Sequence, residues 1–341
     1  MAIALALIPE LFRGQKRHLA NSLMLLAGRL GVGLVVAMCG WLLVAVDTWR
    51  GLLPDALQPL SNWRLTLLAA ALPGLVLVPL ILTMPLLRAR RAAGPDEVPD
   101  ALASSRRDAS VAPAGTAVLP FLARHKLAFA SFYFGVASMV LGIGAVMNFA
   151  PVVAMRQMSA TPLQVANTMG AAMLVATVTG FLIAQVGYRQ LLPRLGPRLP
   201  AMSLLAAAAL GLLMAAGVLL ARSPTQLFVC VGLFMTTVMA GTLLFPLALQ
   251  EMAPAPLRGR LAAIAVTLNI VLGSLGPAVV GAVSDRLKEQ PNGLLLAMVG
   301  VTCLAMLLSM LLLLPLQHRY VQTVSAARHA ECVTDPRGAA A

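Results

Sequence analysis

The chain is 341 residues long, of which 60% are hydrophobic and only 11% are charged, and its mean hydropathy is +0.88. Soluble domains are about 45–50% apolar and about 25% charged, so the composition excludes a soluble fold and places the chain in a lipid bilayer. The net charge of +13 does not indicate a nucleic-acid partner, because the basic residues lie between apolar runs and form no single stripe with interleaved aromatic residues.

Eight apolar runs are long enough to cross a membrane, which takes about 20 residues in a helix. A shorter apolar stretch, MAIALALIP at residues 1–9, precedes them. Because no basic residue lies ahead of its apolar core, we interpret it as the end of another helix and not as a secretory signal. In chain order, the predicted spans are 19–46, 65–87, 126–150, 163–188, 199–221, 225–249, 259–283 and 293–316.

The segment 88–125 is the only long polar stretch between the predicted spans. It is rich in Pro, Ala, Ser and charged residues, a composition that cannot bury a core, so we predict a flexible linker. The linker divides the chain into a partial N-terminal bundle at 1–87 and a six-helix bundle at 126–316. Residues 317–341 are also short of apolar residues and are predicted to form a loosely ordered tail.

Lys and Arg residues are distributed unevenly between alternate connections. Of the 25, 18 lie in one set of connections, 6 lie in the other, and Arg29 lies within a predicted span. Cytoplasmic loops carry an excess of Lys and Arg, so this bias places the linker and the C-terminal tail in the cytoplasm. The bias alternates without a break, which supports the span count. We therefore expect a multi-pass protein of a bacterial inner membrane.

Cysteine and histidine give no indication of a metal or cofactor. Three cysteines lie inside apolar runs, the fourth is alone in the tail, and the four histidines lie in polar connections. This pattern supports neither a disulfide framework nor a zinc site. No paired carboxylates, HExxH motif or Ser-His constellation occurs in the spans, so we expect no cofactor and no enzymatic activity.

The run LNIVLGSLGPAVVGAVSDRL at 268–287 contains many residues that weaken a helix. Small residues let the backbones of membrane helices approach closely, and proline bends a helix. We therefore predict a moving packing contact at Gly273, Gly276, Pro277 and Gly281. The alternative is that glycine and proline are simply more frequent in membrane helices.

Two polar residues inside the spans are candidates for a substrate site. Arg29 and Asn269 each lie about ten residues from a span end, roughly 15 Å deep and close to the midplane. A central arginine costs roughly 2.5–3.5 kcal/mol to insert, so Arg29 should face a cavity or an ion-pair partner. As a permanent cation it is suited to a carboxylate or an anionic head group. Asn269 contacts either substrate or a neighbouring helix.

Three stretches resemble major facilitator superfamily transporters. The block 257–287 is similar to their eleventh helix, most closely in the spinster-like branch, with Asn269 and Gly273, then Gly276 and Pro277, then Gly281 and the Ser-Asp pair that ends in Asp285. The stretch IPELFRGQKRHLANS at 8–22 resembles the turn between the fourth and fifth helices. NWRLTLLAAALPGLVLVPLIL at 62–82 resembles the start of the sixth.

The resemblance implies an all-α membrane fold: a major facilitator-type bundle with a partial N-terminal lobe and a complete six-helix C-terminal lobe. It implies that the first three helices and most of the fourth are missing. MNFAPVVAMRQ at 147–157 resembles the family's exit from the seventh helix, which makes Asn148 a further candidate for substrate binding. Asp285 and Arg286 would form either an external latch or a solvated turn. Where relatives often carry an Asp, GFLIAQVGYRQ at 180–190 has no acid.

The function implied is secondary-active transport by alternating access, with a small amphipathic or anionic organic solute as substrate. The expected partners are that solute, the lipid bilayer and a coupling proton, and we expect a monomer. The alternative is a truncated, transport-inactive fragment of such a transporter.

Overall fold

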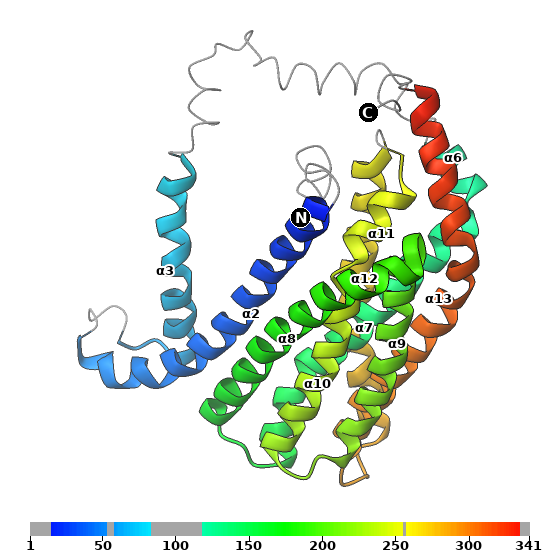
Figure 1. Cartoon of the computed structure of the whole chain (residues 1–341). Coiled ribbons are helices and arrows are strands. Elements are labelled where there is room, and N and C mark those ends of the chain that lie inside the picture. The colour runs from blue at the N-terminus through cyan, green and yellow to red at the C-terminus, as the bar shows by residue number, and fades with distance from the viewer. Residues whose placement is uncertain (1–14, 53–57, 83–117, 255–256, 335–341) are drawn as a thin grey trace.

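The computed structural model describes residues 15–52, 58–82, 118–254 and 257–334, and this part of the chain is helical and contains no β-strand (Figure 1). Three short 3-10 turns, η1 (Arg50–Leu52), η2 (Gly196–Arg198) and η3 (Val218–Leu220), join longer helices. The α-helices are α2 (Gln15–Trp49), α3 (Asn62–Leu82), α6 (Val118–Arg124), α7 (Lys126–Gln157), α8 (Pro162–Leu195), α9 (Leu199–Gly217), α10 (Pro224–Thr242), α11 (Phe245–Met252), α12 (Arg258–Arg286) and α13 (Gly293–Thr334).

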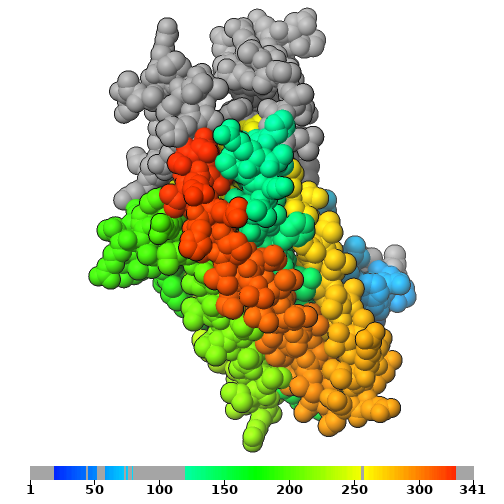
Figure 2. All heavy atoms as spheres, turned by 90° about the vertical axis from the view of Figure 1, so that its right-hand side faces the viewer, coloured from blue at the N-terminus to red at the C-terminus, as the bar shows by residue number. Residues whose placement is uncertain are grey.

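Helices α7 to α13 form one bundle. Helix α7 packs along both α12 and α13, and α10 packs against both α8 and α9. Figure 2 shows the face on which α13 lies beside α6 and α7. We call the end of the bundle where α7 and α12 begin and α11 ends the upper end, as it lies in Figure 1. The core of the bundle is aromatic and aliphatic, and its largest fully buried side chains include Phe129, Phe132, Phe228, Phe234 and Tyr320.

Six helical stretches in the described residues are long and apolar enough to cross a membrane. They are Leu19–Leu43, Lys126–Gln157, Pro162–Leu220, Pro224–Met252, Arg258–Arg286 and Gly293–Ala327. The stretch Pro162–Leu220 corresponds to two predicted spans, 163–188 and 199–221. The chain reverses direction between them at η2, where Gly196 has φ +53°. Figure 1 shows α8 and α9 as two separate legs. The predicted span 65–87 corresponds to α3, and residues 83–87 lie outside the described part.

The predicted span 225–249 is interrupted. Helix α10 ends at Thr242, and α11 begins at Phe245 with Pro246 in its first turn. Proline has no N–H, so the Thr242 carbonyl lacks the donor that would continue the helix four residues later. The Leu243 N–H still bonds to the Met239 carbonyl at 3.1 Å, and the Leu244 N–H to the Gly241 carbonyl at 3.3 Å. The span is therefore two helices joined by a short break.

Helix α2 packs along α8, and α3 packs against α2. The α2–α8 contact is close because small residues face each other. A Cβ added to Gly170 would lie 2.9 Å from the Ala37 Cβ, and one added to Gly40 would collide with Ala166. In a bilayer, where hydrophobic drive between helices is weak, such contacts supply the packing. The α2–α3 connection is held by Arg50, which donates to the Gln58 carbonyl at 3.1 Å and the Leu60 carbonyl at 3.2 Å.

The expected loose tail at 317–341 is wrong for residues 317–334, because α13 continues without interruption to Thr334. Tyr320 is fully buried, and its hydroxyl donates to the Glu251 carboxylate at 2.8 Å. The last residues of the predicted linker are also helical, since they form α6. Its Phe121 ring packs against Phe129 of α7, with ring centroids 5.8 Å apart. Residues 88–117 and 335–341 lie outside the described part.

Candidate functional site

A cavity of about 480 Å³ lies where α2 faces the bundle. We call it the central cavity. Its lining comes from α2, α7, α10, α11 and α12, and it includes the break between α10 and α11. The lining residues are Leu25, Arg29, Val136, Val140, Ile143, Gly144, Met147, Met239, Thr242, Leu243, Phe245, Val266, Asn269, Ile270 and Gly273. Most of them are apolar, so a bound molecule would be held mainly by its apolar surface.

Arg29 supplies the positive charge of this cavity. It lies one helical turn after Leu25, so α2 directs both side chains to the same side. Its side chain is exposed to the open space and makes no hydrogen bond or ion pair with any described residue. None of the lining residues is acidic. From the sequence we expected Arg29 to face either a cavity or an ion-pair partner. In the described part of the chain it faces the cavity.

Asn269 enters the cavity from α12. Val266, Ile270 and Gly273 lie within one turn of it and line the same space. Its side-chain amide is half-buried and forms no hydrogen bond with the described residues. An amide offers donors and an acceptor, so Asn269 can fix the orientation of a polar group that Arg29 attracts. The fold thus brings together two residues that lie 240 positions apart in the sequence.

Asn148, the third candidate for substrate binding, does not line the cavity. Its side-chain N–H₂ donates to the Gly144 carbonyl of its own helix at 2.8 Å, and the residue is exposed. Thr242 and Phe245 line the cavity although the sequence did not single them out. The Phe-Pro pair at the start of α11 is the signal that could have indicated them, because proline often marks irregular backbone in a membrane helix.

The glycines of α12 lie against α7 at two of the three predicted positions. A Cβ added to Gly276 would collide with the Leu141 carbonyl oxygen and lie 3.0 Å from the Ala145 amide nitrogen. One added to Gly273 would lie 2.9 Å from a methyl group of Val140. On the facing helix, a Cβ on Gly144 would be 2.5 Å from the Gly273 carbonyl oxygen and 3.8 Å from the Pro277 ring.

The remaining residues of the predicted packing and gating set lie apart from this contact. A Cβ added to Gly281 would meet no atom within 4 Å. Asp285 pairs with Lys288 at 3.1 Å, and both side chains are largely exposed. Arg286 is exposed at the end of α12. These residues have the geometry of a solvated turn, which was one of the two alternatives for Asp285 and Arg286.

Above the central cavity, buried polar contacts join α2 to the bundle. The Asn21 amide donates to Gln250 Oε1 at 3.0 Å, and the Gln250 amide donates back to Asn21 Oδ1 at 3.4 Å. The two residues are 0% and 3% exposed. Arg258 Nε donates to the Gln250 and Ala253 carbonyls, each at 3.1 Å. A reciprocal amide pair shielded from water therefore joins α2 to α11 at the upper end.

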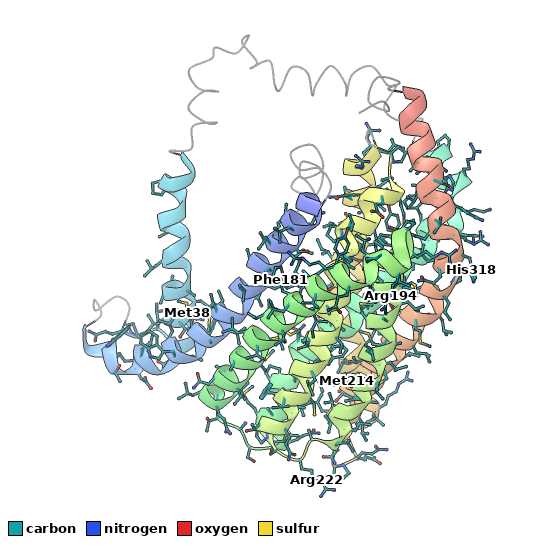
Figure 3. All side chains as sticks on the ribbon, in the orientation of Figure 1. Met38, Phe181, Arg194, Met214, Arg222 and His318 are labelled. Carbon is teal, nitrogen blue, oxygen red and sulfur yellow. The ribbon has the colours of Figure 1, made fainter. Side chains whose placement is uncertain are left out.

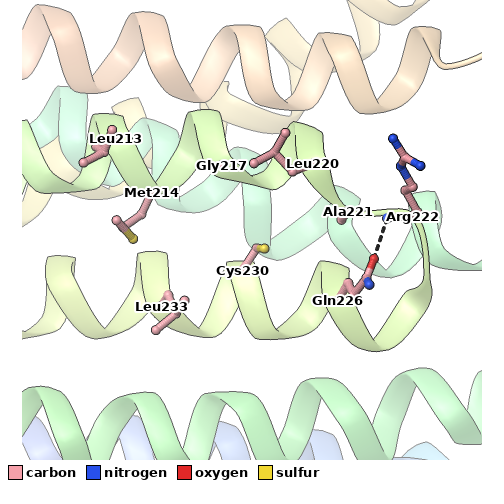
Figure 4. A pocket seen from close by; sticks show the side chains of 9 residues that line it. All are labelled: Leu213, Met214, Gly217, Leu220, Ala221, Arg222, Gln226, Cys230 and Leu233. Atoms are coloured by element: carbon pink, nitrogen blue, oxygen red, sulfur yellow. Dashed lines mark hydrogen bonds between the residues drawn. The ribbon is translucent and has the colours of Figure 1, made fainter.

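A second cavity, of about 430 Å³, lies between α9 and α10 at the opposite end (Figure 4). Leu220 at its edge is 80% exposed, and the backbone N–H of Arg222 donates to Gln226 Oε1 at 2.9 Å. Figure 3 shows Arg222 at the lower end of the molecule, opposite the upper end. The crevice is lined only by α9, α10 and the turn between them, whereas the central cavity is lined by five helices and includes both Arg29 and Asn269, so the central cavity is the better candidate. Among the described residues, no group of three or more His, Cys, Asp or Glu could hold a metal ion.

Comparison with known proteins agrees with this architecture. The model of the Major Facilitator Superfamily matches residues 1–277, which include α2, the bundle as far as α12, and the whole of the central cavity. No curated protein matches the chain. The family consists of transporters, which fits the expectation that the chain is not an enzyme. Because the match spans more than half of the sequence and the helices have membrane length, the chain belongs to the Major Facilitator Superfamily and is an integral, multi-pass membrane protein of a transporter family.

Proposed function

We propose that this transporter moves a small amphipathic organic anion by alternating access. The observation that carries the proposal is that Arg29 and Asn269 line the same largely apolar cavity, and that neither side chain has a hydrogen-bond or ion-pair partner among the described residues. A cation without a protein partner at this depth is costly, and a bound carboxylate, sulfonate or phosphate would offset that cost. The apolar lining would take the rest of the molecule.

The size of the cavity supports a small organic molecule. Small-molecule sites are about 300–1,000 Å³ in volume and combine an apolar lining with a few placed polar groups, as the central cavity does. Within the proposal, the spinster-like branch rests on the motif at 257–287, and the orientation in a bacterial inner membrane, with the linker and C-terminus cytoplasmic, rests on the Lys and Arg distribution. A coupling proton rests on the family resemblance alone, because none of the described lining residues is acidic.

The substrate class is tested by thermal unfolding of the purified full chain with matched amphiphiles. A medium-chain carboxylate or sulfonate is expected to raise Tm, whereas the corresponding neutral amide and primary amine are not. The control is the carboxylate series with shortened chains, for which stabilisation should decline as apolar contact is lost. Equal stabilisation by the neutral amide, or preference for the amine, would contradict an anion site.

Alternating access requires one end of the cavity to be closed while the other is open. We assign the upper end to the cytoplasmic side, and the amide pair of Asn21 and Gln250 to its closure. Removing one partner should cost about 1 kcal/mol and so raise opening of this end about fivefold. Because α2 and α11 belong to different parts of the chain, loss of the pair would let them separate.

This closure is tested by labelling Val266→Cys, which lines the cavity, after the four native cysteines are replaced by serine. A membrane-impermeant maleimide is added from the cytoplasmic side, and the labelling rate is measured with and without Asn21→Ala. Thr168→Ala is the control, because the Thr168 hydroxyl bonds only within its own helix, to the carbonyls of Gln164 and Val165. Identical labelling rates for Asn21→Ala and Thr168→Ala would refute the role of the amide pair.

A further inference from the structure

A basic pocket lies on the outside of the bundle at its upper end, where the start of α7 meets α13. Its volume is about 320 Å³, and its polar lining is Arg124, His125, Lys126, Arg319, Gln322 and Thr323. It shares no lining residue with the central cavity. We propose that this pocket binds the phosphate-bearing head group of an anionic phospholipid.

The charge of the pocket favours an anion. Arg124, Lys126 and Arg319 are exposed, they come from α6, α7 and α13, and none of the residues that line the pocket is acidic. Burial and the neighbouring Arg124 lower the pKa of His125, so this histidine is neutral at pH 7 and adds a hydrogen-bonding ring without a charge. The pocket therefore has three cationic side chains and no acidic lining residue to neutralise them, which suits an anionic ligand.

The neighbouring apolar surface favours a lipid over a free phosphate. On α13, Leu308 and Leu311 precede Arg319 and Gln322 by 11 residues each, which is three helical turns, so both pairs lie on one face. Leu308 and Leu311 are exposed. The exposed apolar face of α13 thus leads directly to the basic pocket, roughly 12 Å along the axis from Leu311 to Arg319.

Helix α7 also carries exposed apolar residues that lead to the basic pocket. Leu127, in the pocket, and Phe134, two turns further along the helix, are both about half exposed. Figure 2 shows α13 and the α6–α7 segment side by side on this face of the molecule. An acyl chain lying along the exposed leucines would bring its phosphate to the level of Arg319. Basic pockets between membrane helices are suited to anionic head groups for this reason.

The test measures binding of phosphatidylglycerol to the full chain in detergent micelles, by native mass spectrometry and by thermal unfolding. Phosphatidylcholine with the same acyl chains is the neutral comparison. We expect phosphatidylglycerol to bind at least tenfold more tightly, and Arg319→Gln or Lys126→Gln each to weaken it about fivefold. Arg319→Lys, which keeps the charge, should retain most of the affinity.

The matched control is Arg194→Gln, because Arg194 is exposed near the same end of the molecule, in the last turn of α8, and does not line the pocket. An equal loss in Arg194→Gln would show general attraction to the charged surface and overturn the proposal. Glycerol phosphate binding as tightly as the lipid would show a site for soluble phosphate and overturn the lipid assignment. Either result is independent of the transport assay, so it leaves the proposed substrate class untouched.

Discussion

Replacing Arg29 by Gln is expected to reduce uptake of an organic anion at least about 30-fold while the protein still inserts and folds. Losing the cationic partner of a desolvated anion costs about 2–5 kcal/mol, and 2 kcal/mol corresponds to a factor of about 30. The folded state itself should change little, because Arg29 makes no hydrogen bond or ion pair with the described residues. Removal of a costly mid-membrane charge should even favour insertion.

Uptake into proteoliposomes and thermal unfolding of the same preparations separate these two effects. Arg29→Lys keeps the charge but loses the planar, two-pronged geometry, so an intermediate rate is expected if the bound group is a carboxylate or phosphate. Arg189→Gln, which removes an exposed charge from α8, is the control and should transport normally. Normal uptake by Arg29→Gln would remove Arg29 from the site, whatever the substrate is.

The second large effect is expected at the α7–α12 contact. Gly276→Ala should lower the free energy of unfolding by about 1–3 kcal/mol, because the added methyl group meets the backbone of Leu141 and Ala145. A side chain could rotate away, but a helix backbone cannot. The two helices must therefore move apart, which also disturbs the neighbouring approach of Gly144 to Gly273 next to the central cavity.

Gly281→Ala is the matched control, since it makes the same chemical change on the same helix where the added methyl group meets no atom within 4 Å. It should leave Tm unchanged or raise it slightly, because alanine is the better helix former. The two variants are compared by thermal unfolding in one detergent. A loss of stability that is equal in both would mean that close packing at Gly276 does not hold the helices together.

The membrane helices could be predicted because length, hydropathy and the alternation of basic residues all report the same boundaries. The break before α11 could not, because proline alone does not determine it. Pro151, Pro193, Pro277 and Pro315 all lie inside uninterrupted helices, whereas Pro246 follows a break. Whether a neighbouring group satisfies the freed carbonyl depends on tertiary packing, which the local sequence does not record.

The extension of α13 was missed for a different reason. The segment after residue 316 has few apolar residues on average, but Tyr320, Val324 and Ala327 recur at helical spacing and are all buried. Two lining residues of the candidate site could be singled out from the sequence. Depth along a span indicated Arg29 and Asn269, but the sequence could not show that they share one cavity. Nor could it show that Gly281 faces away from α7, although five residues beyond Gly276 correspond to a rotation of about 140° around the helix.

Helix α11 has a mechanical consequence. It is only eight residues long, about 12 Å, yet it begins with Phe245 on the central cavity and reaches Gln250 and Glu251, which hold α2 and α13. A helix this short that follows a break in the backbone can change its angle as a unit. We therefore expect that a molecule which displaces Phe245 also shifts Gln250 and Glu251, and so strains their hydrogen bonds to Asn21 of α2 and Tyr320 of α13.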